Sequence, residues 1–274
     1  MTYSIFIPTL PENINSLERT LESINSHIQI SIEVIVSSHL HSQQIQALVS
    51  KYPFAKYLSF PESSNGSKYN LYYMSQNATI GEYIVLLSDN VIVTSDWTES
   101  LVKTKGNFTC GRVSISEDSK IPRNFLNSLY SFYGETAFSS MPNILSLEDF
   151  LLVDNFIIRR DFLESISQLS TFNTFLLQLY CVDNNVDRAY DPSLHISLCV
   201  KEHKFSRDFL FNRSLELQRY YYKLNNHIGT KNRLFRVLNS FVEFFKYSTL
   251  LYFRPINDYK RFSYQLERNK IPFN

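Results

Sequence analysis

The first 200 residues alternate between short continuous apolar runs and longer stretches whose apolar residues recur at helical spacing. Four runs are rich in β-branched or aromatic residues, and we expect each to form a strand: Tyr3 to Pro8, Ile32 to Val36, Glu82 to Leu87 and Phe156 to Ile158. Leu17, Leu21 and Ile24 recur at helical spacing after Asn15, a residue type that caps helices. The chain is therefore predicted to open with a strand and a capped helix.

Further patterns continue the alternation. We expect a helix around Ile45 to Val49, a strand over Lys56 to Phe60, a helix over Lys68 to Asn77 and a helix from Arg160, whereas Thr174 to Val182 fits a helix or a strand. This order predicts an α/β fold with a mostly parallel sheet flanked by helices, and ligand binding beyond the carboxyl ends of the strands. Three polar segments follow such ends: Thr9 to Asn13, Ser37 to His41 and Ser88 to Val91.

Composition supports a folded domain. Hydrophobic residues make up 44% and aromatic residues 15% of the 274 positions, which excludes a disordered chain. No leader-like segment opens the chain, and its apolar runs are shorter than the roughly 20 residues of a membrane-spanning helix. Cys110, Cys181 and Cys199 lack zinc-site spacing, which favours buried thiols in a reducing compartment. We therefore expect a cytoplasmic protein.

Charge divides the chain near Val200. Residues 1–200 hold 12 Lys and Arg against 20 Asp and Glu, whereas residues 201–274 hold 15 basic against 6 acidic residues. The second part is also rich in Phe and Tyr and predicts a basic helical extension that meets an anionic surface. No nucleic-acid-binding motif accompanies it, so we expect peripheral docking on an anionic membrane and no nucleic acid.

Several short motifs follow one another in order: Ile7 to Thr9, Leu17 to Ser23, Glu33 to Val36, Gly66 to Asn70, Gly81 to Leu87, Val91 to Trp97, Phe156 to Phe162 and Tyr190 to Leu194. Together they resemble the family 2 glycosyltransferases over about three quarters of the chain. The resemblance implies a GT-A fold over residues 1–200. It also implies inverting transfer of a sugar from a nucleoside diphosphate-sugar donor to a glycan or a lipid-linked acceptor.

The resemblance also implies which residues serve the donor. The expected nucleotide-sugar-binding residues are Pro8, Thr9, Glu12, Ser38, His39, Lys68, Asn70, Ser88 and Asp89. In the family, Mn²⁺ or Mg²⁺ neutralises the diphosphate and a carboxylate takes the proton of the attacking hydroxyl. The expected metal ligands here are Asp89, Asn90 and His195. For His195, an ordinary hydrogen-bonded histidine is the alternative.

This sequence departs from the family at three motifs. Ser38 stands where an Asp is usual, Asn90 places an amide where the metal-binding Asp belongs, and Asn173 occupies the region of the usual base. Three interpretations of Asp89 stay open. It holds a cation together with Asn90, or cations such as Lys68 and the arginines at 159 and 160 replace the metal, or the site is inactive and Asp89 stabilises a turn.

Carboxylates elsewhere are candidates for the catalytic base. Asp154 is the first choice, because it immediately precedes the strand at Phe156, and Asp149 and Glu148 follow. The missing acids also support a second function, a noncatalytic glycosyltransferase-like subunit that binds a glycan or a partner enzyme. A nucleotidyltransferase is disfavoured because residues 9–13 contain no glycine-rich phosphate loop.

Overall fold

The computed structural model describes residues 2–27, 32–39, 41–60, 78–104, 106–119, 135–145, 153–166 and 174–201, with single residues at 121, 149, 151, 204 and 209. The chain forms two compact units, Met1–Ser116 with Thr136–Cys199 and Glu117–Glu135 with Val200–Asn274. Most of the second unit lies outside the described residues, so the fold given below is that of the first. The predicted basic extension from residue 201 falls in that second unit and stays a prediction.

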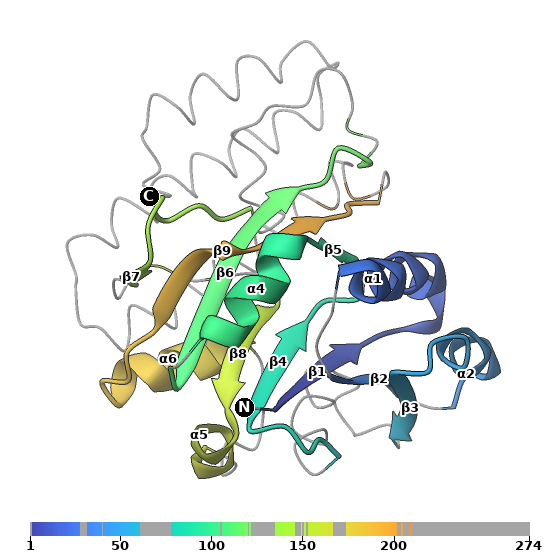
Figure 1. Ribbon diagram of the computed structural model, residues 1–274, viewed down its shortest axis with the longest axis horizontal. Helices are drawn as coiled ribbons and strands as arrows, with labels where there is room; N and C mark the ends of the chain where they lie inside the picture. The colour runs from blue at the N-terminus through green and yellow to red at the C-terminus, as the bar shows by residue number, and fades with distance from the viewer. Residues whose placement is uncertain are drawn as a thin grey trace. The chain divides into compact units, whose positions relative to one another are not determined.

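A mixed sheet forms the centre of the first unit (Figure 1). Its described strands are β1 (Tyr3–Pro8), β2 (Glu33–His39), β3 (Ala55–Phe60), β4 (Tyr83–Leu87), β5 (Val91–Val93), β6 (Phe108–Ile115), β7 (Asn143–Ile144), β8 (Asn155–Arg159) and β9 (Ala189–Leu198). They lie in the order β3-β2-β1-β4-β8-β6-β9-β5, and β7 pairs with β9.

The two halves of the sheet differ in strand direction. β3, β2, β1 and β4 are parallel, whereas β8 runs antiparallel to both β4 and β6. β9 is parallel to β6 but antiparallel to β5 and β7. The predicted α/β fold with a sheet flanked by helices is confirmed. The run of parallel pairs ends at β4, because the next strand in the sheet, β8, runs antiparallel to it.

Helices cover both faces of the sheet: α1 (Ile14–His27), α2 (Gln43–Val49), α4 (Ser95–Lys103), α5 (Arg160–Ser165) and α6 (Thr174–Asp183) (Figure 1). Alternate strand residues, among them Phe6, Ile35 and Phe156, pack into one buried cluster with apolar side chains of α5 and α6. The intervening residues face the side of α1, α2 and α4 and are also buried. Burial on both faces explains why these strands are continuously apolar.

Most predicted elements are present, with shifted ends. β2 continues past Val36 to His39, so Ser38 belongs to a strand and not to a loop. A short 3-10 turn, η1 (Pro11–Asn13), precedes α1, which therefore begins at Ile14, ahead of the predicted cap. The ambiguous stretch from Thr174 is the helix α6. The helix expected over 68–77 lies outside the described residues.

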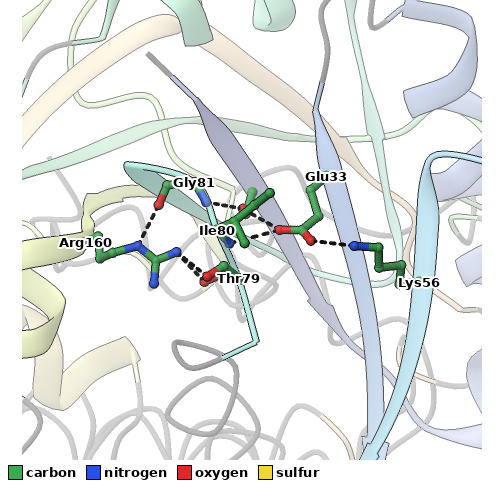
Figure 2. A network of polar contacts seen from close by, with 7 residues as sticks. Glu33, Lys56, Thr79, Ile80, Gly81 and Arg160 are labelled. Atoms are coloured by element: carbon green, nitrogen blue, oxygen red, sulfur yellow. Dashed lines mark hydrogen bonds and ion pairs between the residues drawn. The ribbon is translucent and has the colours of Figure 1, made fainter.

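A polar network closes the amino-terminal edge of the parallel strands (Figure 2). The Glu33 carboxylate accepts hydrogen bonds from Ser4 Oγ at 2.9 Å, Ile80 N at 3.1 Å and Lys56 Nζ at 3.0 Å. Burial opposes ionisation of Glu33 most strongly, but these three donors together hold its pKa below the ordinary value. The network fixes the entry to β4 against β1 and β2.

Arg160 completes this network from the start of α5. Its Nε donates to the Gly81 carbonyl at 2.8 Å, and its Nη2 donates to the carbonyl and hydroxyl oxygens of Thr79 at 2.6 and 2.9 Å (Figure 2). The guanidinium therefore holds the segment just before β4. It lies at the strand edge opposite to the loops that follow β1, β2 and β4.

Among the residues that the structure describes, no helix is long and apolar enough to cross a membrane.

Candidate functional site

Three strand ends meet at the carboxyl edge of the parallel half of the sheet. β1 lies between β2 and β4, so the ends of these strands at Pro8, His39 and Leu87 lie at the same edge of the sheet. The backbone N–H of Thr9 donates to the Ser37 carbonyl at 2.8 Å, which extends the ladder one residue beyond β1. The expected binding region is thus assembled by strand order, although its parts are far apart in sequence.

Asp89 is a buried side chain of this region that accepts two hydrogen bonds. It is only 2% exposed, and its Oδ2 accepts hydrogen bonds from Thr9 Oγ1 at 2.8 Å and Asn13 Nδ2 at 3.0 Å. The structure therefore brings predicted residues Thr9 and Asp89 together. Asn13 was not among the predicted site residues. Its place at the end of a polar segment after a strand is the only sequence signal for it.

Ser88 joins the candidate base to this cluster. Its backbone N–H donates to the Asp154 carbonyl at 3.2 Å, and its Oγ donates to Asp154 Oδ2 at 3.4 Å. Both residues are buried. Because Ser88 immediately precedes Asp89, the two carboxylates at 89 and 154 flank the same strand end. A buried carboxylate held at a strand end is a candidate for taking a proton from a bound hydroxyl.

The other candidate bases are placed differently. Asp149 is half-buried, and its carbonyl accepts a hydrogen bond from Arg188 Nη1 at 2.7 Å. Arg188 is buried, and burial lowers the pKa of its guanidinium. Asp149 is thus tied to the start of β9 by its backbone. Glu148 lies outside the described residues.

Side chains at the end of β2 point alternately to the two faces of the sheet. Ser38 Oγ lies 2.6 Å from Tyr57 Oη, which also accepts a hydrogen bond from Ser42 N at 2.9 Å, so this hydroxyl serves the contact between β3 and α2. Ser37 and His39 project to the other face by strand alternation. Ser37 Oγ is buried and has no hydrogen-bond partner among the described residues.

Of four more predicted binding residues, the structure describes only Pro8 and Glu12. Pro8 is buried at the end of β1, and Glu12 is exposed on η1. Lys68 and Asn70 lie outside the described residues. The two arginines that were alternatives to a metal ion are not at this edge. The strand register places Arg159 opposite Tyr83, at the start of β4, and Arg160 belongs to the network at the amino-terminal edge.

The structure does not bring His195 together with Asp89 and Asn90, the other two predicted metal ligands. Asn90 Nδ2 donates to the Cys199 carbonyl at 3.0 Å, and the β5–β9 register pairs Val93 with Ile196. His195 therefore lies about 13 Å along β9 from Cys199, at about 3.3 Å per residue. Its Nε2 is 2.8 Å from Ser114 Oγ.

The surroundings of His195 agree with an ordinary strand histidine. Its pKa is lowered first by burial and then by Arg112, against an opposing effect of Asp96. No three His, Cys, Asp or Glu side chains form a possible metal site in the described part of the chain. A cation at the β4 end would thus rely on the Asp89 carboxylate, the Asn90 amide oxygen and the phosphates of a donor.

Two of the three cysteines are deeply buried. Burial raises the pKa of the Cys110 thiol far above its ordinary value and that of Cys181 to about 12. Burial therefore favours the protonated thiol at both positions, and it agrees with the buried thiols expected from the sequence.

Solved structures share this fold, whereas no protein-family model and no curated protein matches the sequence. S. aureus TarS, a glycosyltransferase, aligns with a TM-score of 0.56 at 13% identity, over 85% of this chain and 44% of TarS. TarS 1-349 in complex with UDP-GlcNAc aligns with a TM-score of 0.55 at 13% identity, over 80% of this chain and 66% of that one. TarS 1-349 in complex with UDP aligns with a TM-score of 0.55 at 14% identity, over 87% of this chain and 75% of that one. The chain has a glycosyltransferase fold and spans less than half of full TarS.

Proposed function

We propose that this chain is a glycosyltransferase that takes a sugar from a nucleoside diphosphate-sugar and transfers it, with inversion, to a glycan or a lipid-linked acceptor. One observation carries the proposal. The buried Asp89 at the end of β4 is bound by Thr9 and Asn13 from the end of β1 and stands next to Ser88, which contacts Asp154. TarS, which shares the fold, forms complexes with UDP and UDP-GlcNAc.

The donor is expected beyond the ends of β1, β2 and β4. In this arrangement the backbone at Thr9 and Ser37 borders the nucleotide, and Asp89 stands where the diphosphate begins. Thr9 Oγ1 and Asn13 Nδ2 hold the Asp89 carboxylate in one orientation, because both donate to its Oδ2. Asp89 and Asn90 would hold a Mg²⁺ or Mn²⁺ ion, which neutralises the charge that develops on the leaving diphosphate.

Asp154 is the proposed base. Inversion requires a group that takes the proton from the acceptor hydroxyl while that oxygen attacks the sugar. Its Oδ2 accepts a hydrogen bond from Ser88 Oγ, which keeps the carboxylate next to the strand end that carries Asp89. Asp149, an alternative base, has its carbonyl bound to Arg188, which lies just before β9.

A second function is supported by the same contacts. Asp89 is engaged by two protein donors, and the Asn90 amide is bound to Cys199. These contacts would also suit a noncatalytic subunit that keeps the fold and binds a glycan or a partner enzyme. Such a subunit would not turn over any donor.

A screen of donors separates the two functions. The folded protein is titrated calorimetrically with nucleoside diphosphates and their sugars, with and without Mn²⁺, and then assayed for sugar transfer and for donor hydrolysis. Binding together with turnover supports the enzyme. Glycan binding without turnover of any donor supports the noncatalytic subunit.

A further inference from the structure

The segment that leads into β8 carries the candidate bases Asp149 and Asp154, and its described residues are held by hydrogen bonds at several points. Its described residues from Leu145 to Asp154 belong to no helix or strand. Leu145 N donates to the Arg188 carbonyl at 2.8 Å, and Arg188 Nη1 donates to the Asp149 carbonyl. At the other end, Ser88 N binds the Asp154 carbonyl. A third anchor lies between these two.

That anchor is Gln178 on α6, whose amide binds both backbone groups of one residue. Leu151 N donates to Gln178 Oε1 at 3.0 Å, and Gln178 Nε2 donates to the Leu151 carbonyl at 3.0 Å. Gln178 is 0% and Leu151 1% exposed. A buried carboxamide is costly unless its oxygen and its nitrogen are both bonded, and here each has a partner.

The residues on either side of Gln178 in the sequence are apolar and buried. Its neighbours on α6, Leu177 and Leu179, are buried, and Leu177 belongs to the core cluster with α5. A leucine or methionine would fill this volume but would remove the Gln178 partner of the Leu151 N–H and carbonyl. The amide at 178 bonds both backbone groups of Leu151 and so fixes the position of that backbone.

We propose that Gln178 is a positioning residue for the transfer reaction, acting through Leu151 on the carboxylate of Asp154. Leu151 and Asp154 are separated by at most about 11 Å of extended chain, so the closed amide pair limits where that carboxylate lies. Catalytic groups must be held to within about 0.5 Å of their productive place, and such placement comes from surrounding hydrogen bonds. The inference rests on the proposed function.

The test compares two Gln178 variants with a matched control. Gln178→Met keeps the volume and removes both hydrogen bonds, and Gln178→Glu keeps an acceptor for Leu151 N but loses the donor. Ser23→Ala is the control, because Ser23 Oγ also accepts a buried backbone N–H, that of Val93, at 3.2 Å. For each protein, kcat, the donor KM, the melting temperature and hydrogen exchange at the Leu151 amide are measured.

Gln178→Met is expected to lower kcat by about 10- to 100-fold with the donor KM within about twofold of wild type, since misplacement of a reacting group costs rate and not donor binding. Hydrogen exchange at the Leu151 amide should accelerate in Gln178→Met. For Gln178→Glu, both kcat and this exchange rate should lie between those of the wild type and of Gln178→Met. Ser23→Ala should keep its kcat. If Gln178→Met does not fold, the same comparison of kcat with the donor KM in Gln178→Glu tests the positioning role.

An unchanged kcat in a folded Gln178 variant would overturn the positioning role while leaving the proposed function intact. An equal loss of kcat in Ser23→Ala at similar melting temperature would also overturn it, since the effect would then be one of stability. Absence of transfer by the wild type with every donor would instead refute the proposed function, and the inference with it.

Discussion

Asp89 and Asp154 stand on either side of one strand end, and the proposed function gives them different tasks. Asp89 is bound by donors from the β1 end, which suits a fixed group beside the diphosphate. Asp154 lies just before the antiparallel strand β8, and its carboxylate is hydrogen-bonded to Ser88 at the end of β4. Substitution of each carboxylate should therefore have a different kinetic signature.

Asp154→Asn should lower kcat by about 10²- to 10⁴-fold with donor affinity nearly unchanged, because an amide cannot accept the proton of the acceptor hydroxyl. Steady-state kinetics and donor titration check this. Asp161→Asn, at an exposed carboxylate paired with Arg159, is the control and should retain activity. Near-wild-type turnover of Asp154→Asn would assign the base to Asp149 or Glu148.

Glu33→Gln should destabilise the fold by about 1 to 3 kcal/mol, because Lys56, Ile80 and Ser4 all donate to the charged carboxylate. The pKa of Glu33 is lowered from an ordinary value of 4.5, so its contribution is complete above that pH and is lost as the pH falls through the folded-state value. Urea unfolding from pH 7 to pH 3 measures this.

In the Glu33→Gln protein the acid-dependent loss of stability should be smaller than in the wild type. The matched control is Glu18→Gln, which removes an exposed pair with Lys51 at 2.9 Å and should change stability by less than about 1 kcal/mol. Equal effects of the two substitutions would contradict the role given to the network in Figure 2.

Single residues show where sequence reasoning about the site succeeds and fails. Thr9 directly follows β1 and Asp89 follows β4 after Ser88, so both could be expected at the carboxyl edge of these strands, where they are in contact. Asn13 could not be singled out, because its contact with Asp89 depends on the short turn η1. His195 was misplaced because sequence spacing does not give the register of β9 against β5.

At the scale of elements, the contact between β6 and β9 depends on one glycine. The register of the two strands shifts between Gly111 and Val113, and Asn155 Nδ2 donates there to the carbonyls of Leu194 at 2.7 Å and Arg112 at 3.3 Å. Asn155 Oδ1 accepts from Trp97 Nε1 at 3.1 Å. A bulge of this kind leaves no room for a side chain at 111.

Gly111→Ala should therefore lower stability by about 2 to 4 kcal/mol, because the added Cβ would overlap the Leu194 carbonyl oxygen and the Asn155 amide. Thermal unfolding measures the effect. Gly106→Ala is the matched control, since its Cβ would meet Thr109 Oγ1 only at 3.1 Å and Phe108 O at 3.6 Å. A similar small loss in both variants would contradict the close packing assigned to Gly111.

Element type was more predictable than element pairing. Continuous apolar runs identify β1, β2 and β4 because both faces of these strands are covered. The antiparallel insertion of β8 between β4 and β6 leaves no local signal in the sequence, since it is determined by contacts between distant segments. The same holds for Gln178 and Leu151, whose pairing joins a helix to a loop.

At the scale of the whole molecule, the charge asymmetry predicts a membrane-docking role for residues 201–274. This part holds 15 Lys and Arg against 6 Asp and Glu, and each basic residue near an anionic surface contributes about 1 kcal/mol. The full chain should co-sediment with vesicles containing phosphatidylserine at low salt and be released at high salt. Equal recovery with neutral and anionic vesicles at low salt would show that this part has another role.

The central claim is that a nucleoside diphosphate binds where β1, β2 and β4 end. Calorimetric titration of UDP, with Mn²⁺ present, into the wild type and into Asp89→Asn tests it most directly, with thermal unfolding to confirm that the variant is folded. We expect saturable binding by the wild type and at least about tenfold weaker binding by Asp89→Asn, the loss typical of one charged contact. Equal affinity of the two folded proteins, or no binding of UDP or any other nucleoside diphosphate to the wild type, would contradict the account.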